Sequence, residues 1–149
     1  MTVQAIPAGY ETVTPYLIVH DAAAALDYYK KAFGAVELMR FAGKDGRIHH
    51  AEMRVGRGVV MLADEVEGHK GPRSLGGTPV SLMFYVDDVD AVYARAIAGG
   101  GTSVRAVADQ FYGDRSGGIT DPFGHSWWIS THKEDVSEEE MQKRMQAMG

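Results

Sequence analysis

The sequence contains no cysteine among its 149 residues. Disulfide bonds, thiolate metal sites and a cysteine nucleophile are therefore excluded. No apolar stretch approaches the roughly 20 residues that a membrane-spanning helix needs. Residues 1–9 also lack the basic segment and apolar run of a signal peptide. We therefore expect a cytoplasmic protein with no membrane partner.

Clusters of positive charge are missing as well. The 15 Lys and Arg residues are scattered, and 20 Asp and Glu residues give a formal net charge of −5. Nucleic-acid binding needs clustered positive charge, so nucleic acid is not an expected partner. Hydrophobic residues make up 45% of the chain and charged residues 23%, which is typical of a globular domain. The expected partners are small molecules and other copies of the chain.

The first half of the chain predicts the order β-α-β-β-β. A β-branched, apolar run at 14–19 predicts a strand, and Pro15 in it indicates an edge or the start of the strand. Residues 22–33 carry apolar side chains at helical spacing, with Asp21 to cap the first turn and Gly34 to end the helix. Three more strands follow, at 36–41, 48–55 and 59–63.

The same order of elements recurs after a glycine-rich segment at 64–78, which we interpret as the module boundary. A strand is predicted at 80–86, followed by a helix that Asp87 caps, with Asp90 completing a capping box. Aligning Val19 with Val86 superimposes the two halves, which indicates an internal repeat. Three short strands are then expected, at 104–107, 117–120 and 126–130.

A last helix is predicted at 137–148, where Ser137 and Glu140 form a capping box. The helix carries methionines on one stripe, at Met141, Met145 and Met148. We expect this stripe to pack on the domain or on a second subunit.

The order of elements, together with D-P-F-G-H-S-W at 121–127, resembles the vicinal oxygen chelate superfamily. This superfamily includes glyoxalase I, bleomycin-resistance proteins, fosfomycin-resistance enzymes and extradiol dioxygenases. Segments 109–117 and 131–135 resemble its PhnB-like branch, and the resemblance covers about residues 10–136.

The resemblance implies an α+β fold in which two βαβββ modules form a curved eight-stranded sheet around a cavity, followed by a C-terminal helix. In this chain the modules would span about 10–65 and 79–132, the helix about 137–148, and the whole of 1–149 would be one domain. It also implies a homodimer.

Metal-dependent members of the superfamily place a ligand on the first and last strand of each module. The matching positions in this chain are Thr14, Met61, Ser81 and Trp128. None of them offers the imidazole or carboxylate that a divalent cation prefers. We therefore expect no metal and no other cofactor.

Strand alternation divides the residues of the predicted sheet between two faces. The inward face is aromatic and methionine-bearing, which is typical of a small-molecule site and equally of side chains that simply fill the cavity. Arg115 follows Tyr112 and Asp114 in a predicted loop. Its guanidinium either binds an anionic group of the ligand or pairs with an aspartate to brace the loop. The candidate ligand-binding residues are Tyr16, Met61, Met83, Tyr85, Tyr112, Arg115 and Trp128.

His50 and Glu52 share one face of a predicted strand and are the candidate catalytic residues, through proton transfer. The competing interpretation, which the pattern favours, is an exposed face with Arg54 completing a salt-bridged ladder. His125 is predicted to be a surface turn residue. A site that combines His50, Glu52 and His132 also stays open as a possibility, although the spacing of these residues matches no known ligand pattern.

Three functions stay open. The preferred one is a metal-free small-molecule-binding protein of the glyoxalase/bleomycin-resistance type. The alternative is a glyoxalase-like lyase or isomerase, or a dioxygenase-like enzyme, with a non-standard metal site or His50/Glu52 acid–base chemistry. The third is a structural or regulatory dimer whose C-terminal helix docks a partner. No G-x-S-x-G nucleophile elbow or G-x-x-x-x-G-K phosphate loop supports other chemistries.

Overall fold

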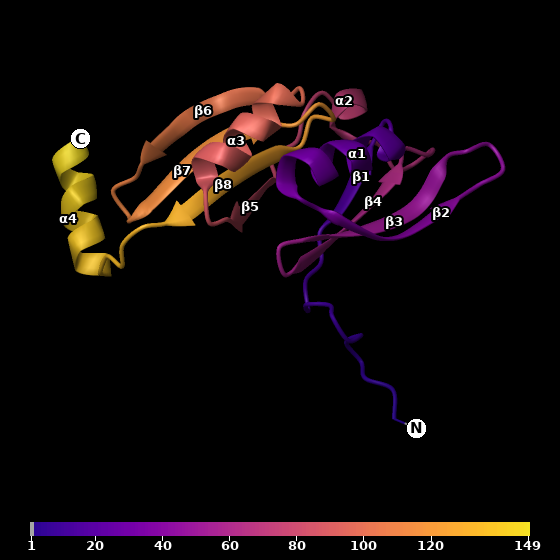
Figure 1. Ribbon diagram of the computed structural model, residues 1–149, viewed down its shortest axis with the longest axis horizontal. Coiled ribbons are helices and arrows are strands. Elements are labelled where there is room, and N and C mark those ends of the chain that lie inside the picture. Colours follow the sequence, from indigo (N-terminus) through magenta and orange to yellow (C-terminus); the bar gives the residue numbers. More distant parts are fainter. Residues whose placement is uncertain (1) are drawn as a thin grey trace. The chain divides into compact units, whose positions relative to one another are not determined.

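A computed structural model describes residues 2–149 (Figure 1). The chain divides into two compact units. Unit 1 contains the residues up to Pro79 together with Pro122–His125, and unit 2 contains Val80–Asp121 together with Ser126–Gly149. Each unit has its own sheet and its own covering helix, as the repeated pattern of the sequence predicts.

Unit 1 forms a four-stranded sheet in the order β1-β4-β3-β2, with β1 parallel to β4 and the other pairs antiparallel. The helix prediction is confirmed at both ends, since Asp21 accepts from the Ala24 N–H at 3.0 Å and Gly34 adopts a left-handed φ of 69°. The elements are β1 (Tyr16–Val19), α1 (Ala22–Phe33), β2 (Val36–Ala42), β3 (Ile48–Val55), β4 (Gly58–Asp64) and α2 (Pro72–Leu75).

Unit 2 repeats the arrangement with the order β5-β8-β7-β6, in which β5 is parallel to β8. The eight strands thus form two sheets of four, and the α+β fold is confirmed. The elements are β5 (Ser81–Tyr85), α3 (Val89–Ala98), β6 (Thr102–Asp109), β7 (Asp114–Thr120), β8 (Ser126–His132) and α4 (Glu138–Met148).

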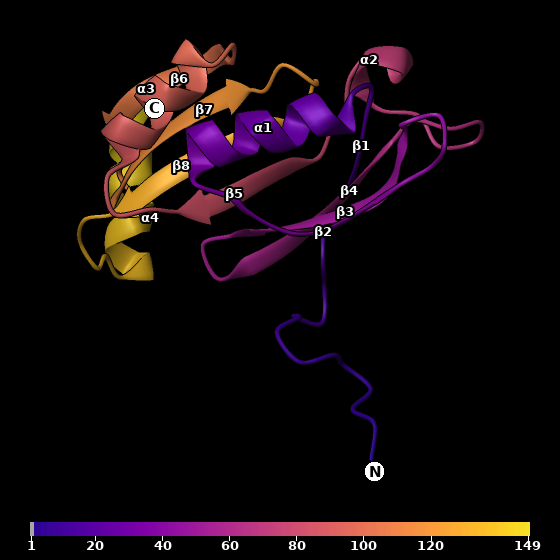
Figure 2. The same ribbon diagram turned by 45° about the vertical axis from the view of Figure 1, so that its right-hand side comes forward.

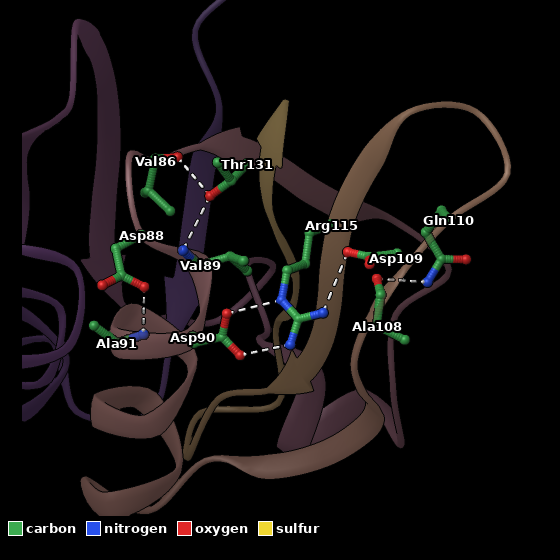
Figure 3. A network of polar contacts seen from close by, with 10 residues as sticks. All are labelled: Val86, Asp88, Val89, Asp90, Ala91, Ala108, Asp109, Gln110, Arg115 and Thr131. Atoms are coloured by element: carbon green, nitrogen blue, oxygen red, sulfur yellow. Dashed lines mark hydrogen bonds and ion pairs between the residues drawn. The ribbon is translucent and has the colours of Figure 1, made fainter. Parts of the chain in front are cut away.

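The N-cap of α3 differs from the prediction. Asp88, and not Asp87, accepts from the Ala91 N–H at 3.1 Å (Figure 3). The reason is that the Val86 N–H still donates to the Ser130 carbonyl at 2.8 Å, so the chain leaves the sheet later than the pattern indicates. The start of β7 at Asp114 is also earlier than the predicted 117–120.

Alternation along the strands gives each sheet one buried and one open face. Helix α1 covers one face in unit 1 and α3 covers one face in unit 2 (Figures 1 and 2). Apolar side chains on the helix-covered faces are buried, as at Leu17, Val19, Leu62, Trp127 and Ile129. We call the opposite side of each sheet its open face. It carries Tyr16, Met83 and Tyr85, whose side chains are exposed.

Helix α4 begins at the predicted capping box, where the Ser137 hydroxyl accepts from the Glu140 N–H at 3.1 Å. Arg144 links α4 to the rest of unit 2, because its guanidinium donates a hydrogen bond to the Phe111 carbonyl at 3.0 Å. The end of the methionine stripe is exposed at Met145 and Met148, so it does not pack on the described chain. Its packing on a second subunit stays a prediction. Across residues 2–149, no helix is long and apolar enough to cross a membrane.

Candidate functional site

A row of hydrogen-bonded side chains crosses the open face of unit 1. The β-ladder places Tyr16 beside Met61 and Met61 beside Glu52. The Tyr16 hydroxyl lies 2.8 Å from His50 Nδ1, and His50 Nε2 lies 2.7 Å from Glu52 Oε2. Tyr10, in the segment before β1, donates its hydroxyl proton to Glu52 Oε1. We call this chain of four side chains, Tyr16–His50–Glu52–Tyr10, the tyrosine–histidine relay.

The salt-bridged ladder that the alternating pattern favours is wrong for this strand. Glu52 is only 5% exposed, and its partners are Tyr10 and His50 and not Arg54. The N-terminal segment covers the carboxylate, and this contact joins residues far apart in the sequence. The two candidate catalytic residues are therefore held together, with Tyr10 as a third member that the sequence analysis did not identify.

Burial and hydrogen bonding act in opposite directions on Glu52. Burial raises its pKa, but hydrogen bonds from Tyr10 and His50 outweigh burial and hold the pKa below its ordinary value. Burial and the Glu52 charge raise the pKa of Tyr16. Near neutral pH, Glu52 is therefore a carboxylate and Tyr16 a neutral phenol. A His50 tautomer with its proton on Nε2 would donate to Glu52 and would leave Nδ1 to accept from Tyr16.

Two cavities in unit 1 adjoin the relay, and both have the size of small-molecule sites, which run from roughly 300 to 1,000 Å³. The first, about 510 Å³, is bounded by Tyr16, Ile18, His49, Ala63, Asp64, Val66 and His69. The second, about 450 Å³, is bounded by Ala5, Ile6, Pro7, Tyr10, Glu11, Thr12, Thr14, Glu52 and Met61. Tyr16 is thus a wall of one cavity, while Glu52 and Met61 are walls of the other.

Asp64 also borders the first cavity, but its carboxylate accepts hydrogen bonds from the backbone. Its two oxygens accept from the Ala22 and Ile48 N–H groups, each at 2.7 Å. These bonds satisfy the first turn of α1 and the start of β3. Ile18 and Ala63 form apolar walls of the first cavity. Tyr16, whose hydroxyl is the end of the relay, borders the same cavity.

The open face of unit 2 carries a different arrangement around Trp128. The indole ring lies on Gly118, where an added Cβ would stand 2.4 Å from Trp128 Cζ3. The Arg105 guanidinium lies 4.6 Å from the centroid of the same ring. A cavity of about 190 Å³ is bounded by Met83, Arg105, Tyr112, Ser116 and Trp128. Three predicted ligand-binding residues meet here, at Met83, Tyr112 and Trp128.

Arg105 was not among the predicted site residues. Its position follows from the register of β6 on β7, which pairs Arg105 with Gly118. The sequence predicts a strand at 104–107 but contains no local signal for this pairing. Alternation combined with that register would have placed Arg105 on the open face.

Tyr85 belongs to a second hydrogen-bonded chain in unit 2. Its hydroxyl donates to Asp114 Oδ2 at 3.0 Å, and His132 Nδ1 lies 2.7 Å from Asp114 Oδ1. His132 Nε2 lies 2.7 Å from Asp135. Hydrogen bonds to these two aspartates raise the pKa of His132, and the bond to Asp114 raises the pKa of Tyr85. The partners of His132 are thus these aspartates and not His50 and Glu52.

The structure corrects the prediction for Arg115. This residue lies in β7 and not in a loop, and its guanidinium forms two bonds to Asp90 of α3, at 2.8 and 3.0 Å (Figure 3). A third bond, of 3.2 Å, reaches Asp109 at the end of β6. These bonds raise the pKa of Arg115. Arg115 therefore braces α3 against the sheet, on the side opposite to Ser116, and we do not assign it to a ligand.

The prediction for His125 also needs correction. His125 is half-buried, and its Nε2 lies 2.9 Å from the Ile18 carbonyl oxygen. Nearby, an added Cβ on Gly124 would stand 2.7 Å from Pro72 Cβ, so the chain approaches α2 closely at this point. These contacts anchor segment 122–125 within unit 1 instead of leaving His125 in an exposed turn.

The four positions that match the superfamily's metal ligands do not fit a divalent cation. Thr14 and Met61 border the second cavity of unit 1 with a hydroxyl and a thioether, and Trp128 presents an indole ring that lies on Gly118. Within residues 2–149, no three or more His, Asp or Glu side chains are grouped as a metal site.

Comparison with known proteins agrees with this fold. The uncharacterized protein Mb0911c of Mycobacterium bovis is 46% identical over 142 residues, which cover 92% of this chain and 93% of that protein. TioX from Micromonospora sp. ML1 is 27% identical in its crystal structure, with a TM-score of 0.65 over 85% of this chain and 100% of that one.

A structure from Bacillus cereus, described as a putative 3-demethylubiquinone-9 3-methyltransferase, PhnB protein, shares the fold at 17% identity. Its TM-score is 0.66 over 81% of this chain and 99% of that one. The model of one protein family also matches residues 10–129 of this sequence. The chain belongs to the Glyoxalase/Bleomycin resistance protein/Dioxygenase superfamily.

Proposed function

We propose that this protein binds a small amphipathic organic molecule, without a metal, on the open face of unit 1. The observation that carries the proposal is the cavity of about 510 Å³ beside Tyr16. Ile18, Ala63 and Val66 offer an apolar surface to the body of the ligand. The Tyr16 hydroxyl offers a polar anchor, because the ring is part of the wall and the hydroxyl is held by His50.

The relay supports this role because its side chains hold one another in place. Glu52 is fixed by Tyr10 and His50, and His50 in turn fixes the Tyr16 hydroxyl. A ligand that binds to Tyr16 therefore does not have to immobilise these side chains, which reduces the entropic cost of binding. The homodimer that the family resemblance implies stays a prediction.

Replacing Tyr16 with phenylalanine should weaken binding about tenfold, which is the usual effect of losing one hydrogen bond of ~1.4 kcal/mol. The ring and the cavity wall stay in place, so the loss of affinity measures the contribution of the hydroxyl alone. The measurement is isothermal titration calorimetry with hits from a thermal-shift screen of amphipathic metabolites. Both tryptophans lie in unit 2, so tryptophan fluorescence is not the assay of choice here.

Tyr93→Phe is the matched control. It removes one hydroxyl from α3 of unit 2, where Tyr93 donates to Ser103, and it should leave the affinity unchanged. Equal losses in the two variants would contradict the assignment of the ligand to Tyr16. A screen that yields no saturable binding at all would contradict the proposed function itself.

A second candidate is an enzyme that transfers protons, and the position of His50 between Tyr16 and Glu52 favours it. In such a site Glu52 orients the imidazole, and His50 passes a proton to or from Tyr16. The phenol then acts as the acid or base toward the substrate. Because the pKa of Tyr16 is raised, the resting state is the protonated acid.

The expected result for this candidate is that His50→Ala abolishes turnover, by at least about a hundredfold, since general acid–base catalysis contributes ~10²–10⁴. Deuterium exchange from solvent into the α-carbon of a panel of ketones, followed by NMR, measures the reaction. His20→Ala changes an exposed histidine that is not among the walls of either cavity of unit 1 and is the control. Exchange that survives His50→Ala would exclude His50 from the mechanism.

A further inference from the structure

We propose that unit 2 carries a second binding site, for a small aromatic carboxylate, formed by Arg105 and Trp128. The site lies on the open face of the sheet β5-β8-β7-β6, around the cavity of about 190 Å³. It shares no residue with the relay of unit 1, so its ligand and its test are independent of the function proposed above.

Trp128 is a fixed aromatic wall of this cavity. It lies in β8 between β5 and β7, paired with Met83 on one side and Gly118 on the other. The indole occupies the space that a side chain at position 118 would need. Since Gly118 has no side chain, one face of the ring is in contact with the sheet. Arg105 lies over the ring, so the indole positions the guanidinium and serves the ligand as a fixed wall that needs no ordering on binding.

Arg105 supplies a positive charge that no carboxylate of the protein neutralises. The ion pairs formed within residues 2–149 do not include Arg105. Arg115 provides the contrast, because Asp90 and Asp109 occupy its donors. Arg105 instead lies over the Trp128 ring, a cation–π contact that holds the guanidinium in place and leaves its N–H groups available to an anion.

The remaining walls of the cavity select the ligand class. Met83 and Tyr112 are apolar or aromatic, and the walls include no acidic side chain. Ser116 accepts a hydrogen bond from Ser130 at 2.9 Å and keeps its own hydrogen for a ligand oxygen. The volume is below the roughly 300 Å³ at which drug-sized sites begin, which favours a single ring.

A carboxylate suits this site better than a phosphate. One guanidinium binds a carboxylate through two parallel N–H···O bonds and balances its single charge. A phosphate monoester carries close to two negative charges near neutral pH, and the site offers only one cation. The combination of one arginine without an ion-pair partner in the described chain, aromatic and apolar walls and a small volume therefore points to a monocyclic aromatic carboxylate.

The test uses benzoate as the probe and the full-length protein labelled with ¹⁵N. The two tryptophans give two indole N–H signals, which Trp128→Phe assigns. Benzoate should shift the Trp128 signal saturably. It should shift the Trp127 signal much less, since that indole donates to Asp121 at 2.8 Å inside the core. Benzamide, which has the same shape without the charge, should bind at least about tenfold more weakly.

Arg105→Gln should weaken benzoate binding at least about tenfold, which corresponds to the loss of a charge-assisted pair of bonds. Arg105 is exposed, so this variant is expected to fold normally. Arg57→Gln, in the exposed turn between β3 and β4 of unit 1, removes the same charge elsewhere and should leave binding unchanged. Comparing these two variants separates a local contact from an effect of net charge.

Three results would overturn the proposal: no saturable shift of the Trp128 signal, equal affinities for benzoate and benzamide, or equal affinities of wild type and Arg105→Gln. Tyr16→Phe should leave benzoate binding intact, because it changes only unit 1. Failure of the unit 1 proposal and failure of this one are thus separate outcomes.

Discussion

Trp127→Ala is expected to lower the free energy of unfolding by about 3–5 kcal/mol, the usual range for removing a buried tryptophan. Trp127 is 2% exposed on the helix side of β8. Its ring meets Phe84 edge-on at a centroid distance of 5.7 Å, and its indole N–H donates to Asp121 Oδ2. The substitution removes this packing and leaves a cavity in the core of unit 2.

Trp128→Ala is the matched control and should cost only about 1 kcal/mol, the centre of the distribution for point substitutions. Its ring is half-buried on the open face, where solvent already reaches it. Urea unfolding followed by circular dichroism measures both variants. The same pair should show the opposite order in the benzoate titration, where Trp128→Ala removes binding. Equal losses of stability would mean that the face assignment of β8 is wrong.

Glu52→Gln is expected to lower the free energy of unfolding near neutral pH by about 1.5–3 kcal/mol, the range for hydrogen bonds to a charged group. The amide of glutamine keeps the shape of the side chain. It replaces one accepting oxygen by a donor, so Tyr10 and His50 cannot both keep a carboxylate partner. The N-terminal segment should then also lose its attachment to the sheet.

The difference between wild type and Glu52→Gln should depend on pH in a defined direction. The pKa of Glu52 in the folded protein lies below its ordinary value of 4.5. The stabilisation is therefore complete above pH 4.5 and disappears as the pH falls through the folded pKa. The two unfolding curves should converge in acid. Glu67→Gln, at an exposed position, should show no such convergence, and parallel curves for Glu52→Gln would contradict the relay.

Both proposed sites depend on the same structural division. In each unit one helix covers one face of a four-stranded sheet, and the polar or cationic groups gather on the other face. Glu52 in unit 1 and Arg105 in unit 2 stand on these open faces with opposite charges. The two modules therefore share one fold but place different charged groups on their open faces, which agrees with the general separation of fold from function.

Residues that act on their chain neighbours were predictable from the sequence. Asp21 and Gly34 define α1, because an N-cap and a left-handed C-terminal residue act within one turn of the helix. Alternation defines β3 and places His50 and Glu52 on one face, because a strand repeats every two residues. The repeat of this order of elements predicts the fold class, and together with the segment at 121–127 it resembles the family to which the chain belongs.

The sequence by itself thus determined most of the elements, the α+β fold and the common face of His50 and Glu52 on β3. Only the tertiary structure decided which partners these residues have. Tyr10 reaches Glu52 across 42 positions of the chain, and Arg105 rather than Arg115 lies on the open face of unit 2. The reason is physical: caps and alternation are local, whereas strand register and the path of an irregular segment depend on contacts that the whole fold brings together.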